Sequence, residues 1–154
     1  MLMSFSVREW NIAINELMRV LKPGGFLELV ESDLRIYDAG PATAQWNRTL
    51  YKVMRDRDFS PRTARHLPDL LLRHGTRNVH GEHRSCPMNW LGRLGQLMFE
   101  DMELAFEALK TPMLRSGSYT DVLSYDRSVD MARGEFANFK SWVNFYAAYG
   151  MKPL

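Results

Sequence analysis

The chain has 154 residues, of which 45% are apolar and 25% charged, and its net charge is +2 at pH 7. This composition is typical of one globular domain with a sizeable core. Cys86 is the single cysteine, which excludes an intrachain disulfide and a thiolate metal cluster. No window approaches the roughly 18 uninterrupted apolar residues of a membrane span, and MLMSFSVREW lacks the apolar run of a signal peptide. We therefore expect no membrane contact and a cytoplasmic or nuclear location.

The first predicted element is a helix that begins near Val7. Ser6 and Glu9 form a capping-box pattern, and Phe5 and Trp10 stand at the positions of a hydrophobic staple. Apolar residues at helical spacing then give one stripe, which consists of Trp10, Ala13, Ile14, Leu17 and Leu21.

A glycine turn and a strand follow this helix. The sequence KPGG ends the helix, because Pro23 restricts the residue before it and Gly24 or Gly25 can adopt a positive φ. The apolar run FLELV, residues 26–30, predicts a strand that is buried on both faces of a parallel sheet. Together these elements indicate the second half of a βαβ unit. The next stretch, SDLRIYDAGP, is rich in turn residues and predicts a loop.

The remaining segments predict helices and two further strands. Pro41 is expected at the first position of a helix that runs to about Asp58. The stretch SPRTARHLPDLLLRHG predicts a helical segment whose regular part begins at Pro68 and which Gly75 caps. TRNVHGEHRSCPM predicts an irregular strand, and KSWVNFYAAYGMKP predicts the final strand.

Two helices are predicted between those strands. Asn89 opens a long one, after which Thr111 and Pro112 begin a separate short turn of helix. Ser118 and Asp121 resemble a cap for another helix that runs to about Phe136. The residues of the long helix that we expect to face inward are Leu91, Leu94, Met98, Ala105 and Leu109.

A set of motifs, in chain order, carries a family resemblance. They are W…AINELMRVLKPGGFLELVESD, GP…W, LPDLLLRHG…NV, LGRLGQLMF and FYAAYGMKP, and they cover essentially the whole chain. The set resembles class I S-adenosylmethionine-dependent methyltransferases, in particular a fungal branch with members that regulate secondary metabolism. The resemblance implies an α/β fold, the C-terminal half of a Rossmann-like seven-stranded sheet with extra helices. This half contains strands five to seven, with the last strand antiparallel and hairpinned onto the sixth. Residues 1–154 would then form a single partial methyltransferase domain.

The glycine pattern bears on the cofactor that the resemblance implies. Family members hold S-adenosylmethionine with a G-x-G loop after strand one and an acid at the end of strand two. None of the ten glycines here is spaced as G-x-G. KPGG enters a strand at its amino end, whereas ligands of open α/β sheets lie beyond the carboxyl ends. We therefore expect S-adenosylmethionine to bind the complete protein, but no cofactor site in this chain, which lacks the N-terminal cofactor-binding half.

Four side chains near the first predicted strand are the candidate substrate-binding residues. Glu31 and Asp33 follow that strand and would face the ligand crevice, where they would orient a substrate or act as a base. Their alternative role is to cap backbone groups in a solvated loop. Tyr37 and Trp46 are candidate walls of the pocket, with ordinary core or surface packing as the alternative. No catalytic residue is identified.

Metal and nucleic-acid sites are not predicted. His80 and His83 are three residues apart, which places them on opposite faces of a strand, and no further ligands are evident. Residues 48–84 hold nine Lys or Arg and four Asp or Glu, so nine minus four leaves +5. Because there is no aromatic interleaving of the kind that stacks on bases, a solvated face is favoured over a nucleic-acid site.

The predicted function is that of one part of an S-adenosylmethionine-dependent methyltransferase, which acts on a small-molecule or protein acceptor. The alternative is a non-catalytic methyltransferase-like module that binds a partner. Strand four of the family is missing, so the strand from Phe26 to Val30 would have a free edge. A dimer or a partner chain is expected to cover that edge.

Overall fold

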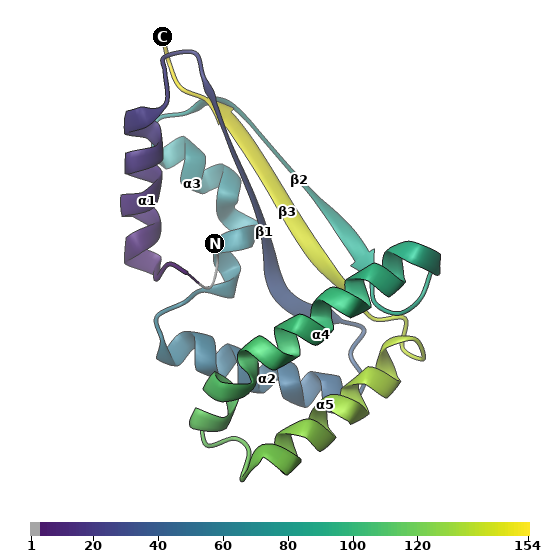
Figure 1. The fold of residues 1–154 in the computed structure, drawn as a ribbon. Helices are drawn as coiled ribbons and strands as arrows, with labels where there is room; N and C mark the ends of the chain where they lie inside the picture. Colours follow the sequence, from purple (N-terminus) through teal and green to yellow (C-terminus); the bar gives the residue numbers. More distant parts are fainter. Residues whose placement is uncertain (1–3) are drawn as a thin grey trace. The chain divides into compact units, whose positions relative to one another are not determined.

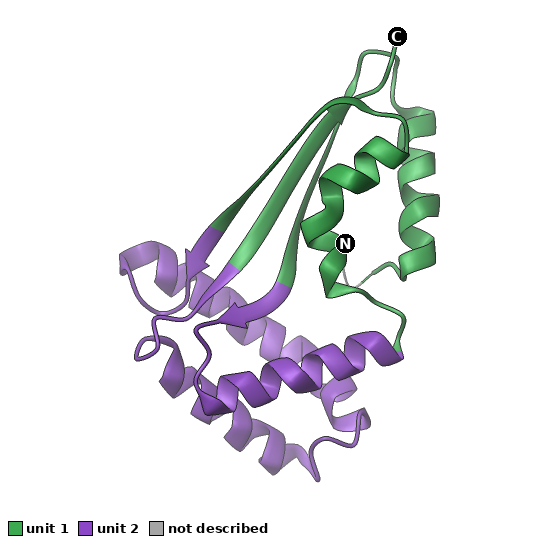
Figure 2. Ribbon diagram, turned by 180° about the vertical axis from the view of Figure 1, so that it is seen from behind, with its two compact units in different colours: residues 1–33, 57–84, 144–154 green, residues 34–56, 85–143 purple. Residues whose placement is uncertain are grey.

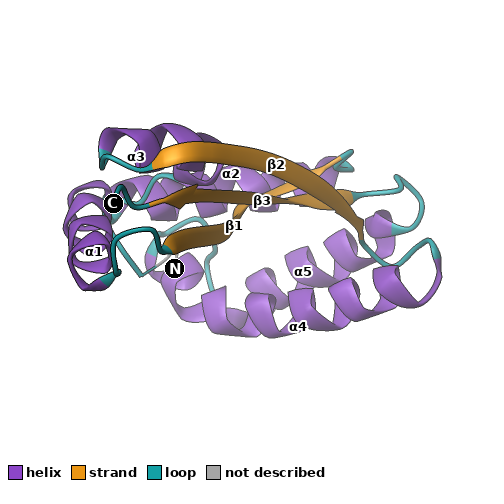
Figure 3. Ribbon diagram, turned by 90° about the horizontal axis from the view of Figure 1, so that it is seen from above, coloured by secondary structure: helices purple, strands orange, loops and turns teal. Residues whose placement is uncertain are grey.

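The computed structural model describes residues 4–154 as an α/β fold with five α-helices and three strands (Figure 1). The elements are α1 (Val7–Val20), β1 (Phe26–Tyr37), α2 (Pro41–Asp56), the 3-10 helix η1 (Pro61–His66), α3 (Leu67–Arg73), β2 (Arg77–Pro87), α4 (Gly92–Arg115), α5 (Val122–Phe136) and β3 (Trp142–Met151). The strands form one antiparallel sheet in the order β1-β3-β2, so the last strand is the middle one (Figure 3). Among the helices of residues 4–154, none has the length together with the apolar character that crossing a membrane would require.

The chain divides into two compact units (Figure 2). Of the described residues, unit 1 holds 4–33, 57–84 and 144–154, and unit 2 holds 34–56 and 85–143. Each of the three strands contributes residues to both units, with the larger part of each in unit 1.

Unit 1 packs α1, η1 and α3 on one face of its part of the sheet. The predicted start of α1 is confirmed, since Ser6 and Glu9 complete the capping box and the Phe5 ring meets Trp10 edge-on at 5.7 Å. The second helical segment is confirmed as η1 followed by α3, with Gly75 at a φ of +84° after its end. The core that these helices share with the sheet consists of Trp10, Ile14, Leu29, Leu67, Leu70, Leu71 and Ala148.

A clasp joins the KPGG turn to the MKP sequence at the end of β3. The backbone N–H of Gly24 donates to the Lys152 carbonyl at 2.9 Å, and the Lys152 N–H donates to the Gly25 carbonyl at 2.8 Å. The Lys152 Nζ also donates to the carbonyls of Met18 and Leu21 at 2.6 and 2.7 Å. An ammonium at this place satisfies carbonyls at the end of α1 and complements the negative end of its dipole. The glycine turn therefore has a structural role, as the sequence predicted.

Strand β1 differs from its prediction in two ways. It continues to Tyr37, so the loop predicted for residues 32–41 is wrong over residues 32–37. It is also not buried on both faces, because exposed Phe26, Glu28 and Val30 alternate with buried residues of the helix-covered face. The physical reason is that the described part of the chain covers one face of the sheet in unit 1, while the pattern FLELV was interpreted as a strand with two covered faces.

Unit 2 is built on three helices that pack on one another, α2, α4 and α5. Pro41 is the first residue of α2, as predicted, and the helix buries Trp46, Leu50, Val53 and Met54. Asp121 caps α5, which ends at Phe136 as expected. In the centre of the unit, the Phe106 ring contacts Trp46 edge-on at 5.1 Å and stacks on Phe136 at 6.2 Å.

Two predictions for the long helix α4 are wrong. Leu91 and Leu94 are exposed. Leu91 precedes the first helical residue, Gly92, and Leu94 lies outside the buried stripe, which consists of Gly95, Met98, Met102, Phe106, Leu109 and Met113. Pro112 does not begin a separate turn but lies inside α4. It stands three residues before the last helical residue, where the loss of one backbone hydrogen bond does not end the helix.

The clasp predicts that Lys152→Met destabilises the protein by about 1–2 kcal/mol, since the end of α1 loses two charge-assisted hydrogen bonds. Urea unfolding followed by circular dichroism measures this change. Lys22→Met is the matched control in the same turn and should change the free energy of unfolding by less than about 0.5 kcal/mol. Equal effects of the two substitutions would contradict a specific role of the Lys152 ammonium.

Candidate functional site

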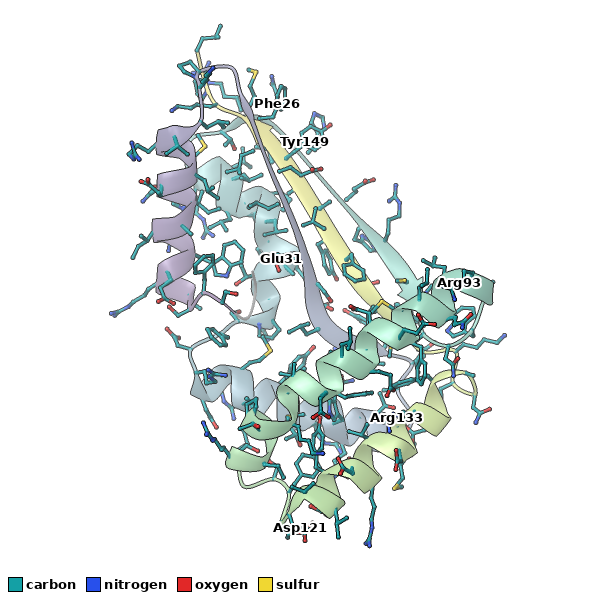
Figure 4. All side chains as sticks on the ribbon, viewed as in Figure 1. Phe26, Glu31, Arg93, Asp121, Arg133 and Tyr149 are labelled. Carbon is teal, nitrogen blue, oxygen red and sulfur yellow. The ribbon has the colours of Figure 1, made fainter. Side chains whose placement is uncertain are left out.

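The two predicted acids lie within β1 of unit 1. Glu31 and Asp33 alternate with Ser32, so both side chains occupy the helix-covered face of the strand; Figure 4 labels Glu31. Glu31 is 8% exposed and Asp33 is fully buried. The expected position in a loop beyond the strand is therefore wrong.

Asp33 is the centre of a polar cluster. Arg65 of η1 donates to its Oδ2 from Nε at 2.9 Å and from Nη2 at 2.7 Å. The hydroxyl of Tyr146 on β3 approaches the same oxygen at 3.4 Å, and the His83 ring of β2 stacks on Tyr146 with centroids 5.6 Å apart. Side chains from η1 and β3 thus meet at the carboxylate of β1, and β2 joins the cluster through the contact of His83 with Tyr146. The Arg65 side chain is 39% exposed, so the cluster reaches solvent on the guanidinium side.

This arrangement fixes the carboxylate rather than presenting it to a ligand. A buried carboxylate needs hydrogen-bond donors, and a guanidinium and a phenol supply them here. The hydrogen bonds between Arg65 and Asp33 are suited to holding η1 in a fixed orientation on β1. Direct attack on a substrate by the Asp33 carboxylate is not favoured, because its side chain is only 1% exposed.

The two predicted aromatic residues belong to unit 2. Tyr37 stacks on Trp142 with centroids 5.6 Å apart and an angle of 6° between the rings, and Arg35 lies 5.1 Å from the Tyr37 centroid. Trp46 is 1% exposed and packs on Phe106, which is the core packing that was the alternative to a pocket wall. The two predicted acids therefore lie in unit 1, and the two predicted aromatic residues lie in unit 2.

Sequence reasoning missed Arg65 and Tyr146 as neighbours of Asp33, and His83 as a neighbour of Tyr146. Arg65 was recognised only as one of nine cations in residues 48–84. A buried acid in a strand requires a hydrogen-bond donor or a cation as its partner. An acid in a predicted strand is therefore a signal that one of the cations lies beside it. The sequence alone does not say which of the nine it is.

His80 and His83 lie on opposite faces of β2 as predicted, because their rings stack on Tyr149 and Tyr146 respectively. Within residues 4–154, no three His, Cys, Asp or Glu side chains are grouped in a way that could hold a metal ion.

The amino terminus of α2 in unit 2 presents N–H donors to an anion, and Glu135 of α5 occupies this position. Its carboxylate accepts hydrogen bonds from the N–H of Ala42 at 2.9 Å, the N–H of Thr43 at 2.8 Å and the Thr43 hydroxyl at 2.7 Å. Gly40 leaves room for this carboxylate, since a Cβ there would lie 2.4 Å from the Glu135 side chain. Burial acts to raise the pKa of Glu135, but these hydrogen bonds outweigh it and hold the pKa below 4.5.

The Asp33 cluster predicts strong coupling between Asp33 and Arg65. We expect Asp33→Asn to lower the free energy of unfolding by about 1–3 kcal/mol, less than for a fully buried pair because the guanidinium is partly solvated. In a double-mutant cycle with Arg65→Gln, the two losses should be less than additive by about 1 kcal/mol or more. Arg62→Gln, on the same 3-10 helix, is the control. Additive losses would show that the ion pair contributes nothing.

Glu135→Gln is expected to destabilise the protein by about 1–2 kcal/mol at pH 7, as loss of a helix cap does. Because the folded-state pKa is lowered, the contribution is present above pH 4.5 and is lost as pH falls through the folded-state value. The difference between the two proteins should therefore narrow in acid unfolding curves. Glu107→Gln, an exposed position on α4, is the control and should keep the native pH dependence.

No protein-family model and no curated protein matches this chain in sequence. The resemblance to methyltransferases therefore rests on the quoted motifs, and the family, activity and cofactor stay predictions.

Proposed function

We propose that this chain forms the rear part of the sheet of an S-adenosylmethionine-dependent methyltransferase, with a small molecule or a protein as methyl acceptor. The observation that carries the proposal is the position of β1. It follows α1 through a glycine turn, stands at one edge of the sheet and leaves Phe26 and Val30 exposed on one face. A sheet with such an edge is suited to extension by a further strand.

The position of β3 is a second support. The resemblance implies a last strand that is antiparallel and adjacent to the strand before it. In this chain β3 is antiparallel to β2 and lies beside it. β3 also lies beside β1, so all three strands belong to one sheet. This agreement concerns topology and says nothing of the acceptor.

The glycines of this chain do not fit the cofactor. Bound S-adenosylmethionine supplies an electrophilic methyl group for transfer to a nucleophilic acceptor atom. The described glycines with positive φ are Gly24, Gly75, Gly92 and Gly117, which are not spaced as G-x-G. Gly24 is committed to the clasp with Lys152. No step of methyl transfer is therefore assigned to residues of this chain, and Asp33 is treated as a positioning residue.

A second candidate function is a non-catalytic module that binds a partner. The same exposed face and edge of β1 favour it, because unpaired backbone groups and apolar side chains are common at protein interfaces. The two functions differ in what the gene encodes upstream of residue 1.

The proposal predicts that the chain alone gives no heat of binding when S-adenosylmethionine is titrated into it. A longer chain that includes an upstream in-frame segment with a strand and a G-x-G loop should bind the cofactor with about micromolar affinity. Micromolar binding of S-adenosylmethionine by residues 1–154 alone would refute the proposal that the cofactor site lies outside these residues. A gene without any such upstream segment would favour the partner-binding module instead.

A further inference from the structure

The face of the sheet in unit 1 that points away from α1 and α3 has apolar and acidic side chains on it. Its exposed apolar residues come from β1 and β3, and Figure 4 labels Phe26 and Tyr149 on this face. Their exposed fractions are 60% for Phe26, 56% for Val30, 36% for Phe145 and 42% for Tyr149. The Tyr149 ring lies between two neighbours, with Phe26 at 6.4 Å and His80 at 5.2 Å between centroids.

A hollow of about 340 Å³ opens beside Tyr149 on this face, and its lining residues are Glu28, His80, Gly81, Glu82, Ala147 and Tyr149. Ala147 on the middle strand is small and lies between the acid of β1 and the acid of β2. Neighbouring strands are about 4.8 Å apart, so the backbones that carry the two acids are about 10 Å apart. That separation leaves room for one cationic group between two carboxylates.

The charges on this face are not balanced by the residues that the structure describes, 4–154. Glu82 forms an ion pair with Arg84 at 2.7 Å, and both side chains are mostly exposed. For Glu28, residues 4–154 provide no cation at ion-pair distance. One carboxylate of the hollow is thus open to a partner's cation, and the other is held only by a solvent-exposed arginine, which is a weak competitor.

We propose that this face binds an amphipathic helix of another polypeptide, and that an arginine or lysine within the apolar stripe of that helix enters the hollow between Glu28 and Glu82. The dimensions fit a helix. Three strands span about 10 Å, close to the diameter of a helix with its side chains. From Phe26 to Val30 the strand advances about 13 Å, which is the length of about nine helical residues.

The charge pattern selects this occupant. An apolar helix without a cation would leave Glu28 buried and unpaired, which is unfavourable. A helix with an acid at the same place would add repulsion. An arginine guanidinium can contact both carboxylates and can also lie against the Tyr149 ring. This inference does not depend on methyl transfer, because a partner of this kind would bind with or without cofactor.

The test uses a fluorescent, helical probe peptide of about 15 residues with one arginine in the centre of a leucine stripe. Matched peptides carry glutamine or glutamate in place of the arginine. Fluorescence anisotropy should give about micromolar affinity for the arginine peptide, with the glutamine peptide about tenfold weaker and the glutamate peptide weaker still. Added salt should weaken the arginine peptide more than the glutamine peptide.

Variants of the chain distinguish specific binding of the arginine in the hollow from nonspecific binding to the apolar surface. We expect Glu28→Gln to weaken the arginine peptide about five- to tenfold and to leave the glutamine peptide unchanged. Ala147→Leu should fill the hollow and abolish the preference for arginine, and Ala147→Val serves the same purpose if the leucine variant does not fold. Glu107→Gln on α4 removes the same charge away from this face and should have no effect.

Three outcomes would overturn the proposal. The first is equal affinity for the arginine and glutamine peptides. The second is an unchanged preference for arginine in folded Ala147→Leu or Ala147→Val. The third is a dimer in sedimentation experiments that Ala147→Leu dissociates, because a second copy of the chain would then be the occupant. None of these results bears on the cofactor titration, so this inference and the proposed function fail separately.

Discussion

The sheet exists because β3 lies between β1 and β2. The two outer strands are not neighbours, so their inward-facing N–H and C=O groups find partners only on β3. The same strand organises the side chains of unit 1. Tyr146 reaches Asp33 on one face, Tyr149 contacts Phe26 and His80 on the other, and Lys152 closes the end of α1. Removal of this one strand would leave the helices of unit 1 without a common surface.

The acids on the two faces of the sheet in unit 1 have different surroundings. On the covered face, the helices exclude water, and Asp33 is compatible with burial because Arg65 and Tyr146 contact it. On the opposite face, Glu28 and Glu82 remain exposed beside apolar side chains. A charged group can stay at the edge of an apolar surface at little cost while water reaches it. The first face therefore contributes to the fold, and the second is available for recognition.

Local signals in the sequence predicted most of the elements, because the side chains that decide them are close together in the chain. Ser6 and Glu9 define the start of α1, and Asp121 defines the start of α5. Features that depend on distant partners were not predictable. Asp33 was assigned to a loop because its stretch is rich in turn residues. The partner that makes its burial in a strand favourable, Arg65, lies 32 residues away in the sequence. The phase of α4 was misjudged, because the helices that bury Met102 and Phe106 are not visible in the spacing of leucines alone.

The order of the strands also has a consequence for synthesis on the ribosome. β1 and β2 are translated before β3, and neither can pair with its neighbour in the sheet until residues 142–151 have left the exit tunnel. Between the synthesis of β2 and that of β3 the nascent polypeptide thus carries two strands with unpaired backbone groups, one of which includes the apolar run FLELV. Such segments invite aggregation and are typical clients of chaperones. The synthesis of β3 therefore sets the moment at which β1 and β2 gain their shared partner.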